Sequence, residues 1–126
     1  MPLTVKEMIA AANSVVERID IATAQEKVAG GAVLLDVRDS NELAATGKAE
    51  GALHISRGML EFLADPAMPT HAPELSLDRP VVLYCVSGGR AALAGKLLKD
   101  MGYAEVYNIG GLKDWAEAGG PVDRSA

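Results

Sequence analysis

The 126-residue chain is poor in several features that would point to common classes of function. Its single cysteine, Cys85, cannot form an internal disulfide, and no group of Cys and His residues has the spacing of zinc ligands. No apolar stretch is long enough to span a bilayer or has the form of a signal peptide. The net charge is −5, and no run of Lys or Arg stands out as a surface for nucleic acid or anionic lipid. We therefore expect a cytoplasmic protein without a metal, cofactor, nucleic-acid partner or membrane partner.

Aromatic side chains are also scarce, at 4% of the residues, whereas apolar residues make up 49%. The core must therefore consist mostly of Ala, Val, Leu and Ile, which suits strands covered by helices. A chain of this length fits one compact domain.

Two near-continuous apolar runs, at residues 32–37 and 81–84, have the pattern of strands that are buried on both faces. Shorter strand patterns occur at residues 52–55 and 106–109, and helical periodicity covers residues 91–101. Because strands alternate with helices nearly throughout, the pattern predicts an α/β fold with a mainly parallel sheet and right-handed crossovers.

The N-terminal segment, residues 1–18, is predicted to form an amphipathic helix from Thr4 to about Arg18, with Thr4 and Glu7 as a capping box. We expect this helix to pack on the main domain, residues 19–120, with a dimer contact as the alternative. Either a monomer or a homodimer is compatible with that expectation. Residues 121–126 are predicted to be a tail beyond the domain, with fraying expected above all at residues 123–126.

The second buried strand leads directly into Cys85, and Gly88 and Gly89 follow before the next helix begins. Ligands of open α/β sheets bind beyond the carboxyl ends of the strands. The glycines let the backbone turn tightly and aim N–H groups inward, and the helix N-terminus adds a partial positive charge. Arg90 contributes a permanent cation. These features favour a Cys85 thiolate, which is the nucleophilic form, in a site for an anion. The alternative is that Cys85 is a small buried hydrophobic residue.

Four segments together resemble the rhodanese family of sulfurtransferases. Residues 34–39, Leu-Leu-Asp-Val-Arg-Asp, resemble its Asp-Val-Arg signature, and residues 51–55, Gly-Ala-Leu-His-Ile, resemble the segment around its Gly-His-Ile-Pro-Gly-Ala motif. Residues 85–90 resemble the active-site loop, and residues 110–115, Gly-Gly-Leu-Lys-Asp-Trp, resemble the closing Gly-Gly-x-x-x-Trp motif. The resemblance covers residues 19–120 and implies a rhodanese-like fold with helices on both faces of the sheet, plus the extra N-terminal helix.

The resemblance also implies a two-step sulfur transfer. The Cys85 thiolate attacks the outer sulfur of an anionic donor such as thiosulfate, and the resulting persulfide passes its sulfur to cyanide, a thiol or a protein. By analogy, backbone N–H groups of residues 86–90 (Val86, Ser87, Gly88, Gly89 and Arg90) hold the persulfide and the donor, and Arg90 fixes the loop or the donor's charge. The Ser87 side chain either donates to a bound anion or only stabilises its own turn.

Two functional alternatives remain. A persulfide carrier or sensor would use the same Cys85 with little turnover. A phosphatase or arsenate reductase is disfavoured, because related enzymes place five residues between cysteine and arginine, whereas four separate Cys85 from Arg90. An arsenate reductase would also commonly need a second thiol.

Other polar residues have a structural and a functional interpretation. Asp36 and Arg38 are expected to form an ion pair that supports the site rather than to react. Arg57 can attract an anionic donor at the rim or remain a solvated charge. We expect His54 to be a hydrogen-bonded structural residue and His71 to be exposed.

Overall fold

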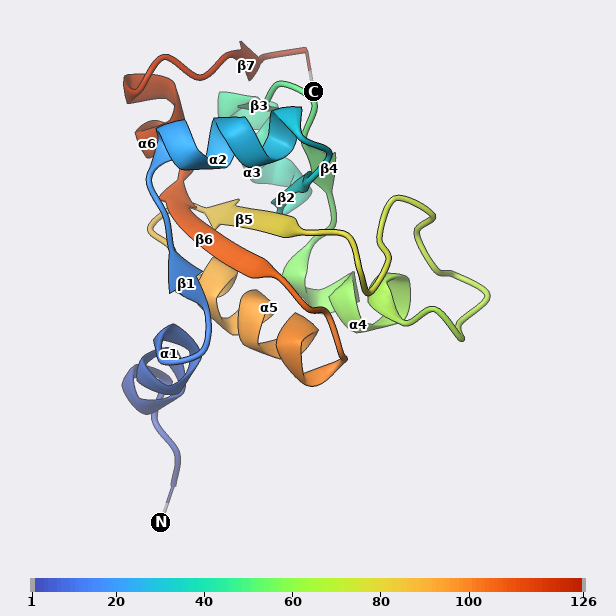
Figure 1. Cartoon of the computed structure of the whole chain (residues 1–126). Coiled ribbons are helices and arrows are strands. Elements are labelled where there is room, and N and C mark those ends of the chain that lie inside the picture. The colour runs from blue at the N-terminus through green and yellow to red at the C-terminus, as the bar shows by residue number, and fades with distance from the viewer. Residues whose placement is uncertain (1, 126) are drawn as a thin grey trace.

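The computed structural model describes residues 2–125, and its centre is a five-stranded sheet in which every neighbouring pair of strands is parallel (Figure 1). The strand order is β1-β6-β5-β2-β4, and a second sheet pairs β3 with β7 antiparallel. The strands are β1 (Glu17–Arg18), β2 (Val33–Asp36), β3 (Lys48–Ala49), β4 (Leu53–His54), β5 (Val81–Cys85), β6 (Val106–Gly111) and β7 (Val122–Asp123). The predicted α/β fold with a mainly parallel sheet is confirmed.

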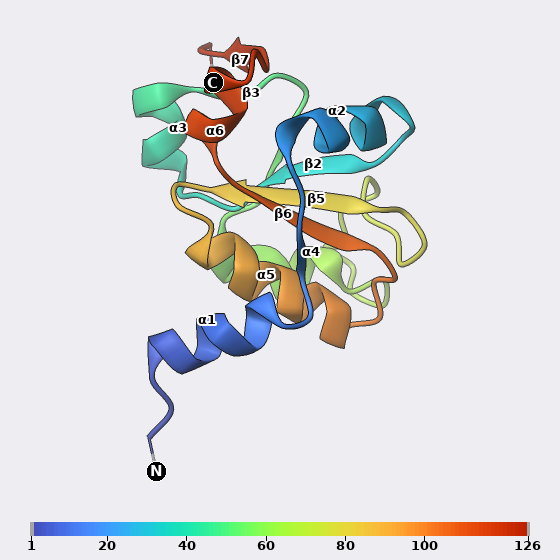
Figure 2. The ribbon, with the colours of Figure 1, turned by 60° about the vertical axis from the view of Figure 1, so that its left-hand side comes forward.

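Helices cover both faces of the central sheet (Figures 1 and 2). One face carries α4 and α5, with α1 outside them, and the other carries α2, α3 and α6. The helical elements are α1 (Val5–Asn13), α2 (Ile21–Ala29), α3 (Ser40–Thr46), the 3₁₀ turn η1 (Arg57–Met59), α4 (Leu60–Ala64), α5 (Gly89–Asp100) and α6 (Leu112–Glu117). No helix within residues 2–125 is both long and apolar enough to cross a membrane.

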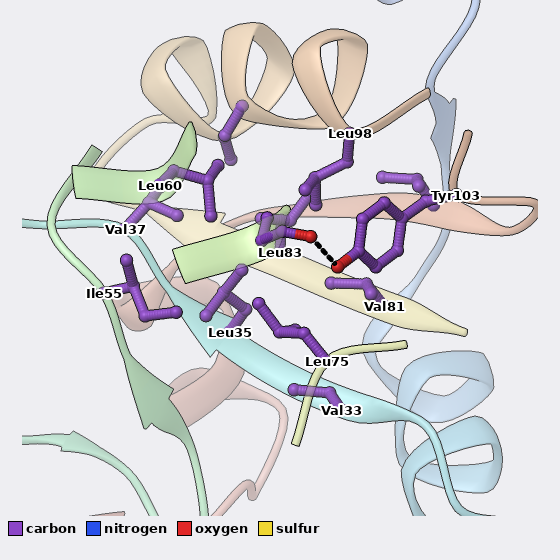
Figure 3. Packing of buried hydrophobic residues seen from close by; sticks show 14 of the residues in the cluster. Val33, Leu35, Val37, Ile55, Leu60, Leu75, Val81, Leu83, Leu98 and Tyr103 are labelled. Carbon is purple, nitrogen blue, oxygen red and sulfur yellow. Dashed lines mark hydrogen bonds between the residues drawn. The ribbon is translucent and has the colours of Figure 1, made fainter. Parts of the chain in front are cut away.

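The larger apolar core lies between the sheet and the α4–α5 face (Figure 3). Leu35 of β2 and Leu83 of β5 point from the sheet towards Leu98 of α5, and all three are fully buried. Tyr103 completes this layer, and its hydroxyl donates a hydrogen bond of 2.7 Å to the carbonyl of Ala64. Both predicted apolar runs form central strands. Helices cover both faces of these strands, so apolar side chains are buried on each face.

The N-terminal segment differs from the predicted helix in its length. The capping box of Thr4 and Glu7 is present, but α1 ends at Asn13, and Glu17–Arg18 form the edge strand β1 beside β6. The predicted continuation to Arg18 is wrong: residues 14–16 form a turn and a bend after α1, which bury Val16 against α5 and β6, and the chain then becomes extended to pair with β6. α1 itself lies against α5.

The C-terminal residues are more ordered than predicted. Val122 and Asp123 pair with β3 as β7, so the expected fraying of the tail is wrong for Asp123. Gly47, with φ of +76°, packs directly on the backbone of Asp123 and Arg124, which leaves no room for a side chain there. Met1 and Ala126, the outer ends of the predicted N-terminal segment and tail, lie outside the described residues.

Candidate active site

Cys85 is the last residue of β5, and it therefore lies at the carboxyl edge of the sheet. Its side chain is 1% exposed. The N–H of Gly88 points back at the sulfur and donates a hydrogen bond to Sγ at 3.1 Å. Gly88 has φ of +101°, a conformation that glycine adopts without strain, and α5 begins at the next residue. A backbone donor and a helix N-terminus thus face the thiol, as the loop sequence predicted.

The loop after Cys85 is braced by β6, the neighbouring strand. The side chain of Asn108 donates to the carbonyl of Gly88 at 3.0 Å and accepts the N–H of Gly110 at 2.8 Å. Gly111 lies so close to the carbonyl of Val86 that a side chain at this position would collide with it. Sequence analysis missed Asn108, although a buried amide inside an otherwise apolar strand was a signal that it serves a specific partner.

Arg90 binds Glu42 of α3 instead of facing an open pocket. Its two terminal nitrogens donate to the two carboxylate oxygens at 2.7 and 2.9 Å. The hydrogen bonds from Arg90 lower the pKa of Glu42 to about 2, and the same bonds raise the pKa of Arg90. Of the two roles expected for Arg90, fixing the loop matches this geometry.

Asp36 and Arg38 form a buried ion pair beneath the site. Arg38 donates to Asp36 at 2.8 Å and also to the Thr46 hydroxyl and the Gly47 carbonyl. The Tyr84 hydroxyl donates to Asp36 at 2.6 Å and accepts the N–H of Ala49. Burial and then the hydrogen bond to Asp36 raise the pKa of Tyr84. The Asp36–Arg38 ion pair, together with Tyr84, thus joins β2 and β5 to the segment that contains β3.

A pocket of about 320 Å³ opens beside Cys85. Among the predicted site residues, only Cys85, Val86 and Arg38 line it. The loop residues from Ser87 to Arg90 lie outside this lining, and so does Arg57, which pairs with Glu61 at 3.2 Å. The remaining lining residues were not predicted and come from α3, α6 and the C-terminal segment: Thr46, Leu112, Lys113, Ala116, Val122 and Arg124.

The two histidines lie outside this pocket lining. His54 donates from Nε2 to the carbonyl of Arg38 at 2.6 Å, as expected of a structural histidine. His71 is partly buried, and its Nε2 has no partner among the described residues, so the prediction that His71 is exposed is wrong. Within residues 2–125 no group of three His, Cys, Asp or Glu side chains could hold a metal ion.

Sequence comparison places this site in a known family. Residues 20–118 match the family model of the rhodanese-like domain, and the chain belongs to this family. It is 34% identical over 101 residues to the thiosulfate sulfurtransferase GlpE of Ectopseudomonas mendocina (strain ymp). That match covers 79% of this chain and 84% of the relative. The relatives support membership in a family of sulfurtransferases.

Two solved structures are similar over nearly the whole chain. A Rhodopseudomonas palustris protein of unknown function, described as a possible tyrosine phosphatase, is 40% identical with a TM-score of 0.87, over 98% of this chain and 99% of that one. The polysulfide-sulfur transferase homodimer of Wolinella succinogenes is 35% identical with a TM-score of 0.73, over 94% of this chain and 85% of that one. These similarities confirm the rhodanese-like fold.

Proposed function

We propose that this protein is a sulfurtransferase that carries sulfane sulfur as a persulfide on Cys85. The observation that supports this most strongly is the hydrogen bond from the Gly88 N–H to Cys85 Sγ at the start of α5. A donor aimed at the sulfur and the positive end of a helix both stabilise a thiolate and, after transfer, a persulfide anion. We place the reaction in the cytoplasm, where an unpaired cysteine stays reduced.

The chemistry takes two displacement steps. With thiosulfate, the Cys85 thiolate attacks the outer sulfur, a new S–S bond forms, and the bond to the sulfonate sulfur breaks as its electron pair leaves with sulfite. An acceptor such as cyanide or a thiolate then attacks the outer sulfur of the persulfide and regenerates the Cys85 thiolate. Both steps conserve charge and need no redox cofactor.

The backbone supplies the binding groups in this account, and the charged side chains hold it in place. The Gly88 N–H donates to the sulfur, and Arg90 keeps the start of α5 against α3 through Glu42. The Asp36–Arg38 pair is occupied by its own ion pair and by hydrogen bonds to Thr46, Gly47 and Tyr84, and we assign it a supporting role.

The position of Arg90 also weighs against phosphate chemistry. A phosphatase of this general type needs the arginine of the cysteine loop to bind the tetrahedral oxyanion with its two-pronged donor group. Here both terminal nitrogens of Arg90 already donate to Glu42, and the loop has only four residues between Cys85 and Arg90. The similarity to a protein described as a possible tyrosine phosphatase therefore does not change the proposal.

Turnover separates an enzyme from a carrier. Thiosulfate and cyanide should give many equivalents of thiocyanate per chain, and Cys85→Ser should give none. A single equivalent that appears in one burst would instead support a persulfide carrier. Activity that survives Cys85→Ser would contradict both proposals.

A further inference from the structure

The two arginines expected to attract the sulfur donor are both paired with glutamates. Arg90 binds Glu42, and Arg57 pairs with Glu61. Arg38 reaches the pocket lining, but Asp36 compensates its charge. Uncompensated side-chain charge for an anion must therefore come from other residues of the pocket.

Lys113 and Arg124 are the other two cationic residues that line the pocket. The Lys113 side chain is 83% exposed, and its ion pair with Glu117 is long, at 3.9 Å. Arg124 donates one hydrogen bond to the carbonyl of Thr46 at 3.2 Å, which leaves most of its N–H groups available to a ligand. Among the described residues that line the pocket, three are cationic and none is acidic, although the whole chain carries a net charge of −5.

Apart from Thr46 and Cys85, the rest of the pocket wall is apolar. Val86 follows Cys85 directly and is 57% exposed, and it is joined by Leu112 and Ala116 of α6 and by Val122 of β7. The volume of about 320 Å³ falls at the lower end of the range for pockets that hold small organic molecules. An inorganic anion alone would leave this apolar surface uncovered, whereas an apolar substituent on the donor would be removed from water against it.

We propose that the Cys85 pocket selects an organic sulfane-sulfur donor of the thiosulfonate class. Lys113 and Arg124 hold its sulfonyl oxygens, and its carbon substituent lies against Val86, Ala116 and Val122. This inference rests on the proposed persulfide chemistry of Cys85. The Cys85 thiolate attacks the outer sulfur, the new S–S bond forms, and the bond between the two donor sulfurs breaks as its electron pair leaves with the sulfinate.

Two probes that differ only in the carbon substituent test the apolar wall. The rate of Cys85 persulfide formation is measured by intact mass with methanethiosulfonate and benzenethiosulfonate, each normalised to its rate with free cysteine. The account predicts that benzenethiosulfonate reacts at least about tenfold faster after normalisation. Ala116→Gln, which places a polar side chain on the wall, should reduce this preference several-fold. Ala118→Gln, on the same helix end but outside the pocket lining, should leave it unchanged.

Charge variants test the anion site separately. Lys113→Gln combined with Arg124→Gln should slow both probes about tenfold, with an effect that fades at high ionic strength, and Lys96→Gln on α5 should slow neither. Equal normalised rates for the two probes, with persulfide forming, would overturn this inference and leave the proposed function standing. A preference unchanged by Ala116→Gln, or rates unchanged in the double charge variant, would also overturn it. No persulfide from these probes or from thiosulfate would overturn both proposals.

Discussion

Arg90 and Glu42, 48 positions apart in the chain, meet through two hydrogen bonds of 2.7 and 2.9 Å. The contact joins the first turn of α5, directly after the Cys85 loop, to α3, which follows β2. Two parallel donors on one carboxylate fix both the distance and the orientation of the two helices. Arg90 therefore fixes the Cys85 loop by binding α3, and its guanidinium group does not face the pocket.

Removing this contact should lower stability in a pH-dependent way. Glu42→Gln should reduce the free energy of unfolding by about 1 kcal/mol at neutral pH, because both side chains are partly exposed to solvent. The folded-state pKa of Glu42, about 2, lies below its ordinary value of 4.5. The stabilisation is therefore complete above about pH 4.5 and is lost as the pH falls towards 2.

Urea denaturation of the native chain and of Glu42→Gln across this pH range measures the difference. Asp100→Asn provides the control, since it removes only the exposed i,i+4 ion pair between Lys96 and Asp100 on α5. It should lower the free energy of unfolding by less than about 0.5 kcal/mol. A difference between the native chain and Glu42→Gln that stays constant from pH 7 to pH 3 would show that the ion pair is not its cause.

Asn108 should matter for both stability and sulfur transfer. Asn108→Ala leaves the buried carbonyl of Gly88 and the N–H of Gly110 without their side-chain partner, which should cost about 1–3 kcal/mol. Because the Gly88 N–H also holds the sulfur, persulfide formation should slow by about tenfold under conditions where the variant is fully folded. Asn41→Ala, at an exposed position of α3, is the control and should change neither quantity. A destabilised variant with the native rate would show that Asn108 does not position the loop.

Gly111 should tolerate no side chain. Gly111→Ala would place a methyl group into the carbonyl of Val86, so the Cys85 loop must shift. We expect a loss of about 1–3 kcal/mol and a clear fall in the rate of persulfide formation, measured by urea denaturation and by intact mass. Gly58→Ala, with open space around the added carbon, should have little effect on either. Native behaviour of Gly111→Ala would mean that the loop is not held by this close approach.

The central strands and the Cys85 loop were predictable because their signals are local. Residues 32–37 and 81–84 are apolar on both faces, and the glycines after Cys85 lie between a strand and a helix. The N-terminal boundary was not predictable, because Val15, Val16 and Ile19 satisfy the helical spacing as well as an extended edge. Only the pairing of β1 with β6 decides between the two.

The pocket wall was beyond prediction for a different reason. Val122 and Arg124 line the pocket beside Cys85 only because β7 pairs antiparallel with β3, more than 70 positions earlier in the chain. A two-residue pairing has no recognisable pattern in the sequence. The partner of Arg90 was not predictable for the same reason, since Glu42 is one of several acidic residues and nothing in the sequence marks it as the one that meets Arg90.

The persulfide on Cys85 is tested most directly by the intact mass of the chain after incubation with thiosulfate and again after reduction, with Cys85→Ser treated in parallel. The account predicts that the native chain gains the mass of one sulfur atom, that a reductant removes it, and that Cys85→Ser gains nothing. An unchanged mass with Cys85 still open to alkylation, for thiosulfate and for both thiosulfonate probes, would contradict the account.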